Sequence, residues 1–463
     1  MRQLLPKTEL APAAALALLC GSAAAVVVWK WLGKRHIQKK MEAARRTRDE
    51  GVKKMAKAVQ QFREQTDAIL SLPLLELAAR LQEGSLSPRT VLYTYIEKAL
   101  EVTQQTNCVQ YFIPECEEQL QEIQQQREKG LLYGIPVSIK DHIGHKGHLS
   151  TCGLVKFLGT PEQEDSVLVK VLKRQGAIPF AKTNVPQSLF NYDCSNLIFG
   201  QTVNPLNHQK TPGGSSGGEG ALIAGGGSLL GIGSDVGGSI RLPCSFCGLC
   251  GLKPTAKRLS LSGISGPVDG IVSVPCVLGP MARDVDSLAL CMKALLCKEM
   301  FQLDPTVPPI PFNEEVYSSS APLRIGYYDT DGYFPLPPCM QRAVHETREA
   351  LQAAGHELFS HPKQEILSFL RKGQQLLWHD PLFLSSLSTG NIVDPSLKPQ
   401  VNFCRIPRLG KKLLALILKP LVSSWLLSQS RVVSASLEIL DSVMVQVYTS
   451  SYKHWEFRPR HVL

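Results

Sequence analysis

The chain has 463 residues, of which 44% are hydrophobic and 19% are charged, so it can bury a large core and is not intrinsically disordered. Its formal net charge is +10, but eight basic residues and a single acidic one lie within residues 30–48. Because the remaining charge is nearly balanced, the sequence predicts no broad basic face and no nucleic-acid partner.

An uncharged, mostly apolar stretch at residues 10–29 precedes this basic cluster. A helix of twenty residues, at about 1.5 Å per residue, is just long enough to cross a bilayer. A cleaved signal peptide would carry most of its positive charge before the apolar run, whereas here the charge follows it. We therefore predict a single transmembrane anchor with everything after residue 30 facing the cytoplasm. A signal peptide and a buried helix are the alternatives.

Helical and strand patterns alternate along the following chain. The predicted helices lie at residues 34–64, 72–84, 87–102, 165–176 and 340–356. The predicted strands lie at residues 133–141, 177–186 and 323–329. The first of these helices alternates charges with small apolar residues, which is typical of a surface helix. The order of elements predicts an α/β fold with a mixed or parallel sheet.

Cysteine and histidine clusters raise the question of a metal. The thirteen cysteines are scattered as expected for reduced thiols. Cys244, Cys247 and Cys250 have the spacing of iron–sulfur ligands but lack the fourth ligand and its proline, so we interpret them as small residues packed near a tight backbone. A second cluster consists of His142, His145 and His148. Because no carboxylate–histidine pattern accompanies these residues, we interpret them as part of a solvated loop rather than a metal site. We predict no metal and no cofactor.

A glycine-rich segment at residues 211–243 marks a place where the backbone turns sharply or is approached closely. It lacks the spacings of phosphate-binding loops. Residues 213–217 fit the G-x-S-x-G pattern of α/β-hydrolases, but the residues before them are polar and interrupted by proline instead of forming a strand. An esterase of that type, with a histidine base, therefore stays as an alternative.

The same segment contains the parts of a serine nucleophile site. Amides around Gly237 and Gly238 can turn inward and stabilise an oxyanion, with Ser239 as the nucleophile and Ser215 as a proton relay. Lys140, at the end of a predicted strand, is the candidate base. It must be neutral, and lowering its pKa from about 10.4 to about 7 costs roughly 4–5 kcal/mol, which requires burial. Turn-forming serines and an exposed lysine are the alternative.

The sequence at residues 211–255 closely resembles the amidase signature family, and "GIPVSIKD" resembles the motif around that family's catalytic lysine. The resemblance implies Lys140 as base, Ser215 as a bridging cis-serine and Ser239 as the acylated nucleophile. The implied oxyanion-hole residues are Val236, Gly237, Gly238 and Ser239. The implied supporting acidic–basic pair is Asp235 and Arg241. Leu189 matches a position whose backbone contacts the substrate region.

Residues 183–205 and 279–297 are most similar to membrane-bound members of this family that hydrolyse fatty acid amides. The resemblance implies a mixed, twisted sheet surrounded by helices and an acyl-enzyme mechanism. It also implies N-acylethanolamine and primary fatty amide substrates, membrane lipid contact, a homodimer and the endoplasmic reticulum membrane as the location.

The implied organisation includes membrane-cap helices at about residues 406–430, whose apolar run is too short to span, with core burial as the alternative. The regions are 1–9, an N-terminal tail; 10–29, the anchor; 30–64, a basic juxtamembrane helix; 65–435, the amidase signature domain; and 436–463, a divergent tail. Because this tail does not resemble the family, a shortened and catalytically impaired relative is a further alternative.

Overall fold

The computed structural model describes residues 10–62, 67–126, 128–267, 275–329, 337–360, 391–407 and 410. The predicted tail at 436–463 and nearly all of the predicted cap at 406–430 lie outside these residues. The central strands are β1 (Val109–Phe112), β2 (Pro136–Lys140), β3 (Ile178–Thr183), β6 (Leu230–Asp235), β7 (Cys250–Gly251) and β8 (Val277–Ala282). They form one sheet in the order β1-β3-β2-β6-β8-β7.

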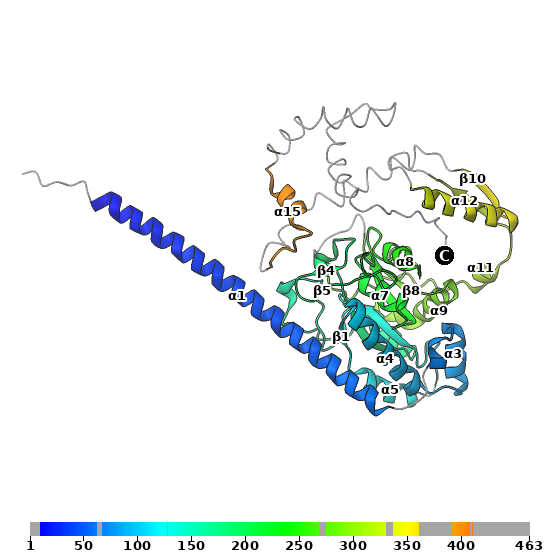
Figure 1. Ribbon diagram of the computed structural model, residues 1–463. Helices are drawn as coiled ribbons and strands as arrows, with labels where there is room; N and C mark the ends of the chain where they lie inside the picture. Colours follow the sequence, from blue (N-terminus) through cyan, green and yellow to red (C-terminus); the bar gives the residue numbers. More distant parts are fainter. Residues whose placement is uncertain are drawn as a thin grey trace, which may run out of the picture.

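Helices surround this sheet (Figure 1). They are α1 (Leu10–Gln61), α2 (Asp67–Leu70), α3 (Leu74–Glu83), α4 (Pro88–Thr106), α5 (Cys116–Gln124), α6 (Val167–Arg174), α7 (Gly217–Ala224), α8 (Arg241–Cys247), α9 (Val285–Leu295), α10 (Lys298–Leu303), α11 (Glu314–Ser318), α12 (Pro338–Ala353) and α15 (Lys398–Arg405), with the 3₁₀ turns η1 (Val155–Phe157) and η2 (Gln187–Leu189). Two small sheets pair β4 (Ser195–Asn196) with β5 (Gly200–Gln201) and β9 (Arg324–Tyr327) with β10 (Glu357–Ser360).

The central sheet is mixed, as the sequence predicts. Strand β2 is parallel to both of its neighbours, β3 and β6, whereas β1, β8 and β7 pair in antiparallel fashion. The predicted helices at 72–84, 87–102, 165–176 and 340–356 correspond to α3, α4, α6 and α12, and the predicted strands correspond to β2, β3 and β9. The α/β fold is therefore confirmed.

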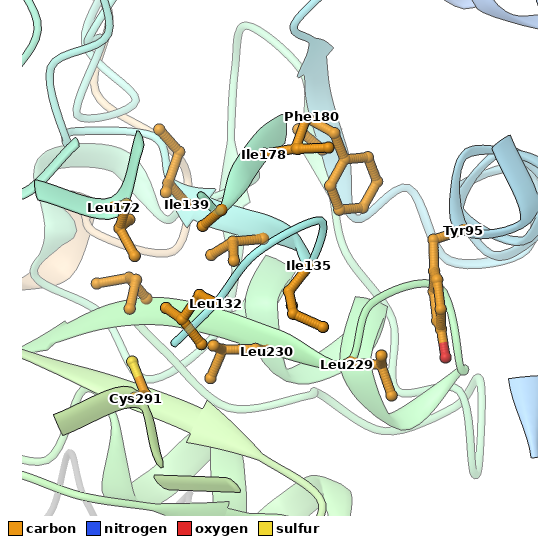
Figure 2. Close-up of a cluster of buried hydrophobic side chains, with 14 of the residues drawn as sticks. Tyr95, Leu132, Ile135, Ile139, Leu172, Ile178, Phe180, Leu229, Leu230 and Cys291 are labelled. Carbon is orange, nitrogen blue, oxygen red and sulfur yellow. The ribbon is translucent and has the colours of Figure 1, made fainter. Parts of the chain in front are cut away.

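Strand β2 separates the apolar core from the polar centre of the molecule. All five of its residues are buried. Because side chains alternate across a strand, Val137 and Ile139 face one side and Ser138 and Lys140 face the other. Figure 2 shows Ile139 among other buried apolar side chains, including Phe180 of β3. On the polar side, Ser138 donates to Glu219 of α7, and Lys140 contacts Ser215 in the turn before α7.

Helix α1 is one continuous helix of 52 residues that projects far beyond the body (Figure 1). The C-terminal half of α1 was predicted to be a surface helix, but it also packs against the body, where Met41 and Met55 are buried. Arg45 also donates to the carbonyl oxygens of Leu197 and Ile198. Within the described part of the chain, no helix meets the length and apolarity needed to span a membrane, so the predicted span at 10–29 is not supported.

Gly218, in the first turn of α7, lets this helix approach the end of β3 closely. Its amide donates to the carbonyl oxygen of Asn184, and an added Cβ would lie 2.3 Å from the Asn184 backbone nitrogen. This contact holds α7, and with it the preceding serine turn, against the sheet.

We expect Gly218→Ala to lower the free energy of unfolding by about 1–3 kcal/mol, because backbone atoms on both sides must move apart. Gly51→Ala is the matched control, since an added Cβ at this α1 position meets nothing within 4 Å. It should be neutral or raise stability by up to about 1 kcal/mol through helix propensity. Urea unfolding of the two variants measures both effects, and equal stabilities would contradict the packing argument.

Candidate active site

The centre of the site is the amine of Lys140, at the carboxyl end of β2. Its side chain is fully buried. Nζ lies 2.7 Å from Ser215 Oγ, 2.9 Å from Ser234 Oγ and 3.4 Å from the Ser234 carbonyl oxygen. Two hydroxyls and a carbonyl thus surround the amine, and no carboxylate of the described residues is in hydrogen-bond contact with it. The structure therefore brings together Lys140 and Ser215, two of the three residues predicted to carry the chemistry.

Burial determines the charge of this amine. Loss of solvation lowers the pKa of Lys140 from 10.5 to about 8, opposed by the more weakly acting Cys276 and Asp235 nearby. About half of the amines are consequently neutral at pH 8. An exposed lysine has an ordinary pKa near 10.4, so it would supply almost no neutral base at that pH.

Ser215 is presented by a tight glycine turn that leads directly into α7. The Gly214–Ser215 peptide bond is cis. Gly214 has no room for a side chain, because an added Cβ would lie 2.4 Å from the carbonyl oxygen of Asn191. The turn is also tied to the second serine turn, since the Ser216 amide donates to the Ser239 carbonyl oxygen at 3.1 Å.

The second turn follows β6 and is organised by the carboxylate of Asp235. Its oxygens accept from the amides of Gly238 and Ile240 at 2.8 and 3.0 Å and form an ion pair with Arg241. Burial alone would raise the pKa of Asp235, but the Arg241 guanidinium and these amides lower it below its ordinary value. The pair predicted to support the site is therefore in direct contact. Gly238 has φ +122°, a conformation that favours glycine.

The predicted oxyanion-hole segment is only partly available. The Gly238 amide is occupied by Asp235. Among the described residues, none accepts a hydrogen bond from the amides of Gly237 or Ser239, and the Ser239 hydroxyl has no partner. Val236 begins the turn and is half-buried. The structure thus places Ser239 beside the Lys140–Ser215 pair through the backbone, with its hydroxyl still unengaged. Catalytic hydrogen bonds are often looser before substrate binds.

A third segment, around η2, covers the two turns. Leu189 and Ser188 both have positive φ, at 59° and 62°, which is uncommon for residues other than glycine. The adjacent Tyr192 donates from its hydroxyl to the Gly237 carbonyl oxygen at 3.1 Å. The segment containing Leu189 therefore lies against the second turn, and Tyr192 is a contact that the motifs did not indicate.

Two residues near Lys140, Ser234 and His142, were not predicted from the sequence to belong to the site. Ser234 was passed over as one more serine of the glycine-rich segment. The prediction of a solvated loop at the histidine cluster was wrong, because His142 and His145 are buried. His142 bonds to Ser234 Oγ of β6 and to the Ser265 carbonyl oxygen, both at 2.8 Å. Burial lowers the pKa of His142 to about 3, so its ring is neutral.

The cysteine cluster packs as predicted. Cys244 and Cys247 are buried free thiols whose sulfur atoms contact carbonyl oxygens of Cys250 and Pro212. In the part of the chain that the structure describes, no group of three or more histidine, cysteine or acidic side chains could hold a metal ion. A nucleophile elbow requires a strand directly before its serine. In this structure, the residues directly before the Ser215 turn form no strand.

At the carboxyl end of β2, the structure thus places a buried lysine amine beside two glycine-rich turns that each carry a serine. The sequence model of the Amidase family matches residues 90–412, and the chain belongs to this family. It is therefore an amide hydrolase.

The chain is also similar to individual proteins. The chain is 64% identical over 412 residues to Vitamin D3 hydroxylase-associated protein of Gallus gallus, covering 88% of this chain and 89% of the relative. It is 50% identical over 415 residues to Fatty-acid amide hydrolase 1 of Sus scrofa, covering 88% and 71%. Among solved structures, a fatty acid amide hydrolase matches with a TM-score of 0.64 and 27% identity, covering 83% of this chain and 76% of that one.

The depressed pKa of Lys140 predicts a pH-dependent stability. Between pH 8 and 10.5 the unfolded chain binds more protons than the folded chain, so the burial penalty is full below pH 8 and disappears as the pH rises. We expect the unfolding free energy of the wild type to rise by roughly 2–3 kcal/mol relative to Lys140→Met between pH 7 and pH 10.

Urea unfolding of both proteins at the two pH values measures this difference. Lys54→Met removes an exposed amine from α1 and serves as the control, whose effect should change by less than about 0.5 kcal/mol. A constant difference for Lys140→Met would show that this amine is charged in the folded protein throughout the range.

Proposed function

We propose that this protein hydrolyses fatty acid amides through Lys140, Ser215 and Ser239. The observation that carries the proposal is the 2.7 Å contact between the buried amine of Lys140 and Ser215 Oγ, beside the turn that contains Ser239. The names of the similar porcine enzyme and of the matching solved structure support amides of fatty acids as substrates. N-acylethanolamines and primary fatty amides are the proposed classes.

In the first half of the reaction, neutral Lys140 takes the proton of Ser215 while Ser215 takes the proton of Ser239. Ser239 Oγ attacks the amide carbonyl carbon, and the carbonyl oxygen becomes an oxyanion that accepts from the Gly237 and Ser239 amides. The C–N bond then breaks as the proton on Lys140 returns through Ser215 to the nitrogen. This protonation matters because an unprotonated amine is a poor leaving group.

In the second half, water replaces the amine. Its proton moves through Ser215 to Lys140 as its oxygen attacks the acyl-ester carbon, and the proton returns to Ser239 Oγ when the ester bond breaks. The products are a fatty acid and the restored serine. Lys140 begins and ends each half neutral, so the relay needs no cofactor.

We further propose that the N-terminal part of α1 attaches the enzyme to membranes. Trp29 and Trp31 are 73% and 55% exposed, and Val27, Val28 and Leu32 beside them are also exposed. Basic residues follow directly in the sequence, an arrangement suited to lipid headgroups. The cytoplasmic orientation is proposed because the basic residues follow the apolar stretch. The endoplasmic reticulum membrane and the homodimer are proposed on the sequence resemblance alone.

A fluorophosphonate probe tests the catalytic proposal. We expect the wild type to be labelled and Ser239→Ala to lose all labelling, because the probe's phosphorus must bond to the nucleophile. Lys140→Ala should slow labelling and amide hydrolysis by at least about 100-fold. Ser85→Ala, at an exposed serine after α3, is the control and should behave as wild type.

Two results of this experiment would contradict the proposal. Substantial amide hydrolysis by Lys140→Ala would favour a histidine base, as in the esterase alternative. A folded wild type that neither labels nor hydrolyses amides would identify a catalytically impaired relative.

Flotation with phospholipid vesicles tests membrane attachment. The wild type should float with the vesicles, whereas a variant lacking residues 10–29 should remain at the bottom of the gradient, because it loses most of the apolar surface. Leu206→Ser, which removes an exposed apolar side chain elsewhere, should float normally. Flotation of the deletion variant would place the lipid contact outside α1.

A further inference from the structure

Ser234 connects the base of the proposed relay to a histidine that the relay does not use. Its hydroxyl oxygen lies 2.9 Å from Lys140 Nζ and 2.8 Å from His142 Nε2. All three side chains are buried. The order of contacts is therefore His142, Ser234, Lys140 and Ser215, a continuous chain from the histidine loop to the cis-serine.

The direction of each hydrogen bond follows from the far end of this chain. His142 Nδ1 lies 2.8 Å from the Ser265 carbonyl oxygen, which can only accept, so Nδ1 carries a hydrogen. Since burial lowers the pKa of the ring to about 3, the ring is neutral and Nε2 carries none. Nε2 must therefore accept, and the hydroxyl hydrogen of Ser234 points to His142.

This direction determines what Ser234 presents to Lys140. Having given its only hydrogen to His142, the hydroxyl oxygen can only accept from the amine. A neutral amine has two hydrogens and one lone pair. Its hydrogens are taken by Ser234 Oγ at 2.9 Å and the Ser234 carbonyl oxygen at 3.4 Å, so the lone pair is left for the third neighbour, Ser215 Oγ.

We propose that His142 is a positioning residue that, through Ser234, turns the lone pair of Lys140 toward Ser215. This inference rests on the proposed function of Lys140 as base. Without an acceptor at the position of Nε2, the Ser234 hydroxyl would find its best acceptor in the amine itself. It would then occupy the lone pair that must receive the Ser215 proton.

The groups around these hydrogen-bonded side chains allow few other arrangements of the hydrogen bonds. Cys276 also contacts Ser234, but a thiol is a weak donor and a weak acceptor compared with imidazole. Charges on Asp235, Cys194, Cys152 and Glu219 also act on Lys140. The Asp235 carboxylate is engaged by Arg241, and the Glu219 carboxyl group bonds to Ser138 and Thr183. Backbone bonds fix the histidine itself, because the Ser265 amide donates to the His142 carbonyl oxygen.

Three substitutions of His142 separate positioning from packing. His142→Gln keeps an amide oxygen near the position of Nε2, His142→Asn keeps only a group near Nδ1, and His142→Leu keeps neither. We expect kcat for amide hydrolysis to fall by about 10- to 100-fold in the Leu and Asn variants, with KM changed by less than about 2-fold. The Gln variant should recover most of the activity.

A double-mutant cycle tests whether the effect passes through Ser234. Ser234→Ala removes the hydroxyl that would be misdirected, so adding His142→Leu to it should lower kcat by less than about 2-fold further. Melting temperatures of all variants show whether each is folded. Because kcat is compared among folded variants, a loss of stability alone would not reproduce the pattern.

The outcomes distinguish this inference from the proposed function. Equal activity of the wild type and His142→Leu, or a Gln variant no better than Asn, would overturn the positioning role while leaving the Lys140 relay intact. The same holds if the His142 effect persists undiminished in Ser234→Ala. A wild type that lacks hydrolysis and fluorophosphonate labelling would overturn the proposed function and this inference with it.

Discussion

The burial of one amine is the constraint on which the rest of the site depends. Lys140 ends the central strand of the sheet and is fully enclosed, with hydroxyl and carbonyl oxygens around its nitrogen. A carboxylate in contact would hold the amine charged, whereas hydroxyls accept from either form. The glycine turn before α7 and strand β6 bring these oxygen atoms to the nitrogen, and the loop carrying His142 contacts one of them, Ser234 Oγ.

A second buried ionisable group also bonds to hydroxyl groups instead of forming an ion pair. Glu219 of α7 interacts electrostatically with Lys140. Burial raises the pKa of Glu219 to about 8, and its carboxyl group forms hydrogen bonds with Ser138 and Thr183. A buried ion pair between this acid and the lysine would have removed the free base. Instead, each group bonds to hydroxyls, and the permanently charged pair, Asp235 with Arg241, is placed at the turn where backbone amides need orientation.

Much of this arrangement could be predicted from the sequence. The buried strand ending at Lys140, the two serine turns and the Asp235–Arg241 pair each follow from local patterns or from the family resemblance. What could not be predicted depends on contacts distant in sequence. The buried His142 bonds to Ser265, and the adjacent Ile143 pairs with Ile264, both more than a hundred residues away in the sequence. Ser234 looks like any small residue of a glycine-rich strand. The occupation of the Gly238 amide by Asp235 likewise depends on turn geometry that composition does not determine.

Burial of the Lys140 amine lowers the stability of the folded protein, so packing elsewhere on the same strand must offset the loss. Lowering the pKa of Lys140 from 10.5 to about 8 corresponds to about 3 kcal/mol of lost stability at neutral pH. That is a large share of the roughly 5–15 kcal/mol by which proteins are stable. The apolar side of the same strand offsets it, since Val137 and Ile139 are completely buried. The two-residue period of β2 thus couples the reactive amine to the core, and a change in register would exchange the two faces and abolish both.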